Sequence, residues 1–112
     1  MNTQVRSAID AVNQLHTLVA RLAQTPVSEA TRLVQVEEDN REFLAAVNNA
    51  QLAIEGALDE VDGQALTKLD FAVDAVRRAR TQYYTPVDGN RANTLTCVEF
   101  AVQNMNAGAR AL

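Results

Sequence analysis

The chain has 112 residues, a formal net charge of −4 and a single cysteine. This length predicts one domain over residues 1–112, the negative charge argues against nucleic-acid binding by the whole surface, and the lone cysteine excludes an internal disulfide. The sequence has no secretory signal pattern and no apolar run near the roughly 20 residues of a membrane span, so we expect a cytoplasmic protein, of a cell or of an infected host, without membrane association.

The first predicted helix runs from Thr3 to about Ala23. Its apolar residues recur three and four positions apart, the spacing of one helix face: Val5, Ala8, Val12, Leu15, Val19 and Leu22. Thr25 and Pro26 follow, and a proline fits the first position of a new helix. Either Thr25 or Ser28 can cap that helix.

The second predicted helix is the longest. Its apolar series alternates three and four residues over about four heptads: Leu33, Val36, Phe43, Val47, Ala50, Ile54, Ala57 and Val61. Only Asn40 interrupts the series. The helix either continues with one polar core position or breaks near Asn40, and the lack of Gly or Pro favours continuity. Asp62 and Gly63 end it, since Gly63 allows positive φ and Asp62 can cap the next helix.

Two further helices complete the chain. The third runs from Gln64 to about Tyr84 on a stripe of Leu66, Leu69, Val73 and Val76, and its next positions are Arg80 and Tyr83. A turn at residues 85–90 precedes the fourth, within residues 91–111, whose stripe is Leu95, Val98, Val102, Met105 and Leu112. A capping box of Thr96 and Glu99 allows a start as late as Thr96. The sequence therefore predicts an all-α, up-and-down bundle of about four helices, the second longest.

Catalytic chemistry has little support in the sequence. A nucleophilic triad needs His beside Ser or Cys, and the chain has one His and one Cys. His16 lies at the flank of an apolar stripe, where a structural role is expected, and Cys97 resembles a small core residue. Paired acids one turn apart, such as Glu38 and Glu42, indicate a solvated face rather than a metal site. We expect no enzyme activity, no metal and no cofactor.

The charges are segregated along the chain. Between Glu37 and Asp62 there are eight acids and one base, whereas residues 68–91 carry five bases beside Tyr83 and Tyr84. Arginine forks and aromatic rings are what binding of an anionic nucleotide needs. The simpler interpretation is that the arginines offset the helix dipole and pair with the acidic helix. Arg80 favours the ligand interpretation, because a lone charge on a core stripe is costly unless it meets an anion.

Phe71 and Phe100 fall on the side of their helices opposite the predicted stripe. That side of a monomeric bundle is expected to be polar. The two rings therefore indicate a second buried surface, either between copies of the chain or with a partner, unless the predicted stripes are misplaced.

Residues 65–70 read Ala-Leu-Thr-Lys-Leu-Asp and open a helix directly after a turn. This run resembles a segment of the small helical-hairpin proteins with which phages sequester cyclic nucleotide immune signals, the anti-CBASS and anti-Thoeris sponges, where it reads approximately Ala-Leu-Thr-Lys-Leu-Glu. Ala72 fits loosely, whereas the tryptophan and the Arg-Glu pair expected further along are missing. The resemblance implies a homo-oligomer that binds cyclic nucleotides between subunits without catalysis.

These observations predict a non-enzymatic, self-associating helical binding protein that sequesters a cyclic nucleotide or similar small anion. The residues expected to bind this ligand are Thr67, Lys68, Arg77, Arg80, Tyr83, Tyr84 and Arg91. The alternative is an inhibitor or adaptor whose acidic second helix docks on a basic protein partner. The residues expected to form that surface are Glu37, Glu38, Asp39 and Glu42.

Overall fold

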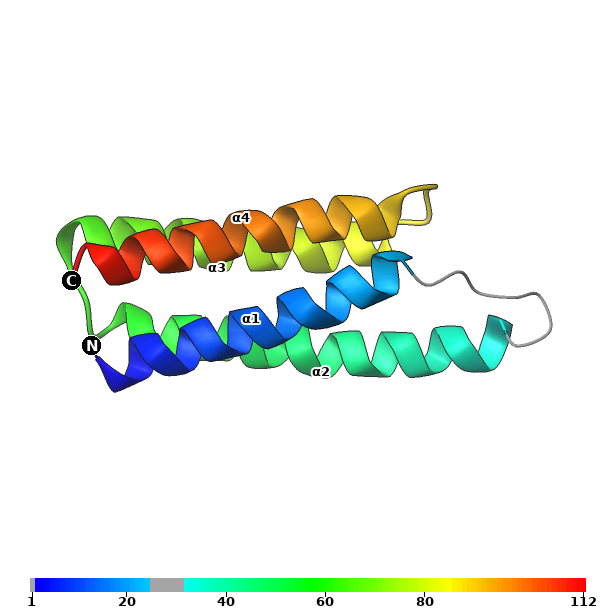
Figure 1. The fold of residues 1–112 in the computed structure, drawn as a ribbon, viewed down its shortest axis with the longest axis horizontal. Coiled ribbons are helices and arrows are strands. Elements are labelled where there is room, and N and C mark those ends of the chain that lie inside the picture. The colour runs from blue at the N-terminus through cyan, green and yellow to red at the C-terminus, as the bar shows by residue number, and fades with distance from the viewer. Residues whose placement is uncertain (1, 25–31) are drawn as a thin grey trace.

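The computed structural model describes residues 2–24 and 32–112, which form four helices and no strand within those ranges. The helices are α1 (Thr3–Gln24), α2 (Arg32–Leu58), α3 (Gly63–Tyr84) and α4 (Asn90–Arg110), of 22, 27, 22 and 21 residues. They lie side by side in an elongated bundle of 50 × 21 × 17 Å (Figure 1). The predicted all-α helical bundle is confirmed.

Each helix packs against two neighbours. α3 packs on α4 and α1 on α2, while α4 contacts α1 and α2 contacts α3, which is an up-and-down arrangement. The α3–α4 pair has the most extensive packing and the α2–α3 pair the least. Both termini lie at one end of the bundle, and the turn from α3 to α4 lies at the other, here called the turn end (Figure 1). No helix in the described residues is both long and apolar enough to cross a membrane.

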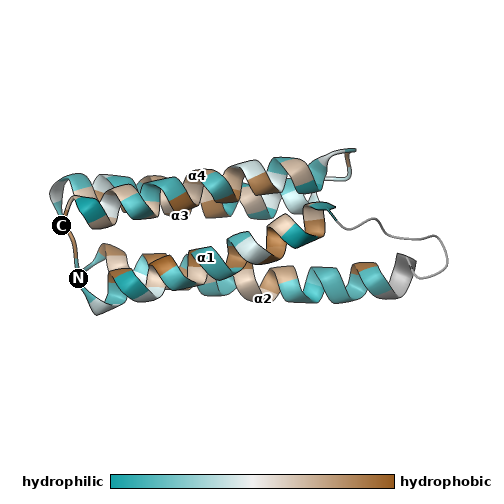
Figure 2. Ribbon diagram, viewed as in Figure 1, coloured by the Kyte–Doolittle hydropathy of each residue, from teal (hydrophilic) through white to brown (hydrophobic). Residues whose placement is uncertain are grey.

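Apolar residues recur along every helix (Figure 2), and the largest fully buried side chains are all apolar. The six residues predicted to form the core face of α1 are all buried. In α2 the predicted core residues from Phe43 onward are buried: Phe43, Val47, Ala50, Ile54 and Ala57. Hydrophobic burial at this spacing supplies the main favourable free energy of folding. The predicted caps Thr25 and Ser28, and the side chain of Leu33, lie outside what the structure describes.

α2 continues without a break through Asn40, as the favoured interpretation predicted. The buried polar residue, however, is Asp39 rather than Asn40. Asp39 is only 2% exposed, while Asn40 is half-buried. Arg91 of α4 provides a partner for this carboxylate, and a paired carboxylate can occupy an interior position that an unpaired one cannot. α2 then ends at Leu58, before the predicted end near Val61.

The turn between α2 and α3 follows the prediction only in part. Gly63 has φ +59°, the left-handed conformation that glycine adopts without strain. Asp62 occupies the N-cap position of α3 with extended backbone, but its side chain forms no capping hydrogen bond. The expected side-chain cap is therefore wrong, while the expected backbone turn is confirmed.

α4 begins at Asn90, so the alternative start at Thr96 is wrong, and its buried face differs from the predicted stripe. The buried residues are Thr94, Val98, Ala101, Asn104, Met105 and Gly108. The predicted Leu95 and Val102 are only partly buried, and Leu112 is exposed. Small residues bring α4 close to α3, since a Cβ atom on Gly108 would lie 2.4 Å from Leu69 Cδ1. The prediction is confirmed for Val98 and Met105, but a stripe of large residues missed the small and polar residues of this face.

Candidate functional site

An aromatic cluster lies at the turn end of the bundle. The rings of Phe43 and Tyr83 are stacked, with centroids 3.9 Å apart and planes at 12°. Tyr84 meets both rings edge-on, with centroid distances of 5.9 Å to Phe43 and 5.1 Å to Tyr83. Of these two consecutive tyrosines at the end of α3, Tyr83 is buried in the core and Tyr84 is exposed at the surface.

Arg91 connects three helices beside this cluster. Its Nη2 donates to Asp39 Oδ2 at 2.9 Å, and its Nη1 donates to the carbonyl oxygen of Leu22 at 3.0 Å. Gln35 Nε2 donates to the other oxygen of Asp39 at 3.0 Å. Because both the guanidinium and the carboxylate are largely buried, this ion pair is shielded from solvent far more than the surface pairs are.

A cavity of about 330 Å³ opens at the turn end. It is lined by Val36, Asn40, Tyr83, Tyr84, Thr85, Pro86, Asn90 and Arg91. Asn90 Nδ2 donates to the Tyr83 carbonyl oxygen at 2.8 Å, which fixes the start of α4 beside the end of α3. The predicted ligand residues Tyr83, Tyr84 and Arg91 therefore share one cavity.

The hydroxyl of Tyr83 is buried and has no hydrogen bond of normal geometry with any described residue. Burial raises the pKa of this phenol, and the positive charge of Arg91 lowers it by a smaller amount. The two tyrosines therefore contribute ring surface to the cavity, beside an arginine whose charge is already balanced by Asp39. A phosphate bound there would have to compete with Asp39 for the Arg91 guanidinium.

The other predicted ligand residues lie elsewhere. Thr67 Oγ1 donates to the Gly63 carbonyl oxygen at 3.3 Å, and Lys68 Nζ lies 5.9 Å from the Phe71 ring centroid. Both residues are in the first turns of α3, about 24 Å along the helix from Tyr83. One copy of the chain therefore does not bring all seven predicted residues together.

Arg77 and Arg80 face α2. Arg77 Nη2 lies 3.5 Å from Glu55 Oε1, an exposed and weak ion pair. Arg80 is half-buried and its Nη2 donates to Asn48 Oδ1. The anion expected beside Arg80 is thus replaced, within the chain, by a neutral amide oxygen.

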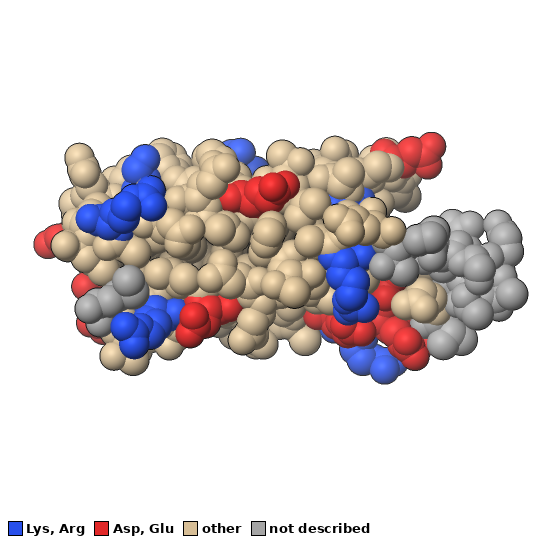
Figure 3. All heavy atoms as spheres, viewed as in Figure 1, with Lys and Arg blue, Asp and Glu red and all other residues tan. Residues whose placement is uncertain are grey.

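The acidic residues of α2 do not form one continuous acidic surface. Glu37 and Glu38 are exposed, Asp39 is buried against Arg91, and Glu42 pairs with Arg21 at 2.6 Å. On the face drawn in Figure 3, acidic and basic side chains are interspersed and much of the surface is uncharged. Two of the four predicted docking residues are therefore already engaged by arginines of the same chain.

The residues considered for catalysis lie apart. Cys97 is partly buried beside a cavity of about 240 Å³ that Arg77, Arg78, Thr81 and Gln82 also line. Burial raises the pKa of its thiol, and Arg78 opposes the shift. His16 is half-buried in α1. No three His, Cys, Asp or Glu side chains of the described residues are grouped to hold a metal ion.

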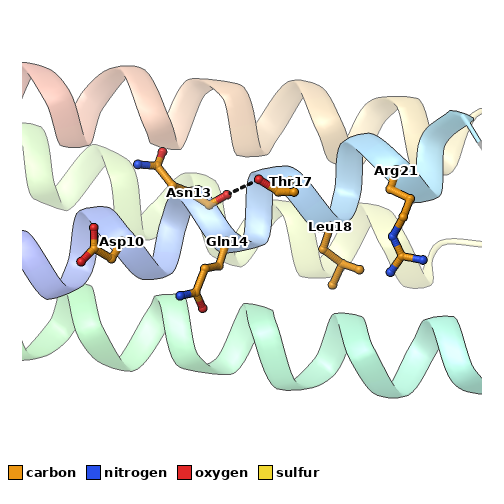
Figure 4. A pocket seen from close by; sticks show the side chains of 6 residues that line it. All are labelled: Asp10, Asn13, Gln14, Thr17, Leu18 and Arg21. Carbon is orange, nitrogen blue, oxygen red and sulfur yellow. Dashed lines mark hydrogen bonds between the residues drawn. The ribbon is translucent and has the colours of Figure 1, made fainter.

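A shallow hollow of about 570 Å³ lies on α1, and the sequence did not predict it. Side chains of a single helix line it: Asp10, Asn13, Gln14, Thr17, Leu18 and Arg21 (Figure 4). Thr17 Oγ1 donates to the Asn13 carbonyl oxygen at 3.1 Å. The six side chains point in different directions, so they do not converge on one ligand position.

Sequence analysis also missed Val36, Asn40, Thr85, Pro86 and Asn90 as lining residues of the turn-end cavity. In the sequence, only position indicates them, since Thr85, Pro86 and Asn90 lie in the predicted turn of residues 85–90. Comparison with models of known families, with curated proteins and with solved structures found no match to the chain.

Proposed function

We propose that this chain is a non-enzymatic binding protein that works as an assembly of its own copies. The surface through which copies meet is the outer α3–α4 face, defined here by Phe71 and Arg78 of α3 and by Cys97 and Phe100 of α4. The observation that carries the proposal is that Phe71 and Phe100 are each 48% exposed on adjacent helices. Large exposed aromatic residues of this kind are typical of interfaces.

Helical geometry places these residues on one surface. Phe71 lies two turns before Arg78 on α3, and Phe100 lies one turn after Cys97 on α4. Cys97 and Arg78 line the same cavity between the two helices. Both phenylalanines therefore flank the same outer groove, and a two-fold axis could set Phe71 of one copy against Phe100 of another.

One arginine on this face already has a carboxylate partner, and a lysine lies beside an aromatic ring. Arg78 Nη2 pairs with Asp74 Oδ2 at 2.8 Å, and the Lys68 ammonium lies over the Phe71 ring. A second copy can cover the face without separating a charge from its partner, which lowers the cost of burial.

A non-enzymatic role agrees with the state of the one cysteine. A reactive cysteine needs a lowered pKa, and the pKa of Cys97 is raised by burial. The ion pairs of the acidic helix favour this proposal over docking on a basic partner, since of the four predicted acids only Glu37 and Glu38 are exposed and form no ion pair with another described residue.

The test is the native mass by light scattering. We expect the unchanged chain to exceed the 12.2 kDa of one copy, and we expect Phe71→Glu and Phe100→Glu to lower the mass to one copy. Leu52→Glu is the matched control, because Leu52 is more exposed but lies on α2. A mass of one copy for the unchanged chain at every concentration would contradict the proposal.

Sequestration of a cyclic nucleotide is the second candidate, and it is supported by the shared cavity of Tyr83, Tyr84 and Arg91. A phosphate must compete with Asp39 for Arg91, so Asp39→Asn should strengthen nucleotide binding where folding is retained. Thermal shift with a panel of cyclic nucleotides tests this, because a bound ligand raises the melting temperature. No shift with any member, for either protein, would remove the candidate.

A further inference from the structure

A second exposed apolar surface follows the boundary between α2 and α3. We call it the α2–α3 seam and define it by Leu44, Asn48 and Leu52 of α2 and by Arg80 and Tyr84 of α3. Leu44, Leu52 and Tyr84 are 45%, 67% and 47% exposed. These helices have the least extensive packing of the four neighbouring pairs, and a cavity lies at their boundary.

The three α2 residues form one line. They are four positions apart, so they lie on one face of the helix and span about 12 Å from Leu44 to Leu52. Asn48 and Leu52 line a cavity of about 300 Å³ together with Arg80 and Gln51. Tyr84 lies at the turn end of this boundary, where its ring packs edge-on against Phe43 of α2.

Arg80 is the unusual member of the seam. Its half-buried guanidinium donates to Asn48 Oδ1, and no carboxylate pairs with it in residues 2–24 and 32–112. The Oε1 atom of Gln51, in the same cavity, is buried without a partner among those residues. A half-buried cation that meets only a neutral acceptor gains from a carboxylate placed beside it.

We propose that the α2–α3 seam binds an amphipathic helix of a partner protein that presents one carboxylate between two leucine-type side chains. A groove between two helices accommodates a third helix through residues at helical spacing. In a partner helix, apolar residues at positions i and i+8 lie about 12 Å apart, which is also the separation of Leu44 and Leu52 along α2. A Glu at position i+4 lies midway between them. Its carboxylate then faces Arg80 while the apolar residues of the partner helix cover the two leucines.

This inference concerns a different surface from the outer α3–α4 face, so the two proposals fail separately. A second copy of the chain is the rival occupant of the seam. If copies occupied it, Leu52→Asn would lower the native mass, and that result would overturn the assignment of the seam to another protein.

The probe is a synthetic helical peptide of about 18 residues, long enough to be stabilised as a helix on binding, with Leu, Glu and Leu at i, i+4 and i+8. In an NMR titration of the full chain we expect shifts at Leu44, Leu52 and Arg80. Replacement of the central Glu of the peptide by Lys should weaken binding at least about tenfold, because a cation would then face Arg80. This comparison leaves the protein unchanged and so cannot be confused with unfolding.

The protein variants complete the test. Arg80→Gln should weaken the Glu peptide at least about tenfold and should abolish the difference between the Glu and Lys peptides. Arg110→Gln, an exposed charge at the end of α4, is the control and should leave binding unchanged. Absence of binding, equal binding of the two peptides to the unchanged chain, or shifts confined to Phe71 and Phe100 would overturn the proposal.

Discussion

The outer α3–α4 face and the α2–α3 seam both expose large apolar side chains, but they differ in how their charges are balanced. On the first, Arg78 pairs with Asp74, and Lys68 lies over an aromatic ring. On the second, Arg80 meets only an amide oxygen among the described residues. The difference indicates that exposed apolar area alone does not define a partner. An arginine that is already paired with a carboxylate can be covered by a second copy without a new counterion, whereas a half-buried arginine that meets only an amide oxygen gains from a carboxylate supplied by a partner.

The helix packing beneath the two surfaces also differs. α3 and α4 approach closely through small residues, with Gly108 directly against Leu69. α2 and α3 pack less extensively and leave Arg80 and Gln51 beside a cavity. A rigid base supports a fixed interface between copies, and a looser boundary leaves room for an inserted helix.

The largest expected effect on stability concerns Arg91. This largely buried arginine is paired with the Asp39 carboxylate, whereas Arg80 has no carboxylate partner among the described residues. Asp39→Asn should lower the free energy of unfolding by about 3 kcal/mol, because it leaves the largely buried Arg91 without its counterion. Glu42→Gln, which breaks the exposed pair with Arg21, should cost under about 1 kcal/mol. Urea denaturation of both variants measures the difference. Equal losses would show that burial does not distinguish the two pairs.

A smaller effect is expected at the seam itself. Arg80→Met should raise the free energy of unfolding by about 1 kcal/mol, since an apolar side chain replaces a half-buried charge that has no carboxylate partner in the described chain. Arg78→Met on the outer α3–α4 face removes an exposed pair and should change stability by under about 0.5 kcal/mol. Denaturation in urea compares them. A loss of stability for Arg80→Met would remove the contrast between the two surfaces.

The smallest effect is a dependence on alkaline pH at the turn end. The pKa of Tyr83 is raised from its ordinary value of 10.0 by burial, so the folded state holds the phenolic proton more tightly than the unfolded state. The free energy of unfolding should therefore fall as pH rises above about 10 and through the raised pKa. Tyr83→Phe should reduce this fall. Because it removes a buried hydroxyl that has no hydrogen bond of normal geometry with a described residue, it should leave neutral-pH stability equal or higher by about 1 kcal/mol.

Tyr84→Phe is the control for that experiment, because Tyr84 is nearly half exposed. Thermal unfolding followed between neutral and alkaline pH compares the two variants with the unchanged chain. If the fall in the free energy of unfolding at alkaline pH persisted in Tyr83→Phe and disappeared in Tyr84→Phe, the effect would belong to Tyr84, and the prediction would be wrong.

The sequence predicted the fold where burial follows large residues at helical spacing. The six core residues of α1 and the exposure of Phe71 and Phe100 follow from that spacing alone. The face of α4 did not, because Gly108 and Ala101 are buried through close contact with α3 rather than through their own hydrophobicity. Small residues carry little signal in an apolar pattern.

The candidate site was also predictable only in part. Tyr83, Tyr84 and Arg91 flank one turn, so their shared cavity follows from their nearness in the chain. The pairing of Arg91 with Asp39 joins residues 52 positions apart and depends on how α2 and α4 are placed. No local pattern specifies that pair, and the sequence instead suggested Asn40 as the polar core position and Asp39 as a surface acid.

The central claim is that copies of the chain cover the outer α3–α4 face, and the reaction rate of Cys97 with a thiol reagent tests it most directly. Cys97 is the only cysteine of the chain, lies one turn from Phe100 and is only partly buried in one copy. We predict that labelling slows as the protein concentration rises, and that Phe71→Glu is labelled at one fast rate throughout. A rate that is independent of concentration and equal in the two proteins would contradict the account.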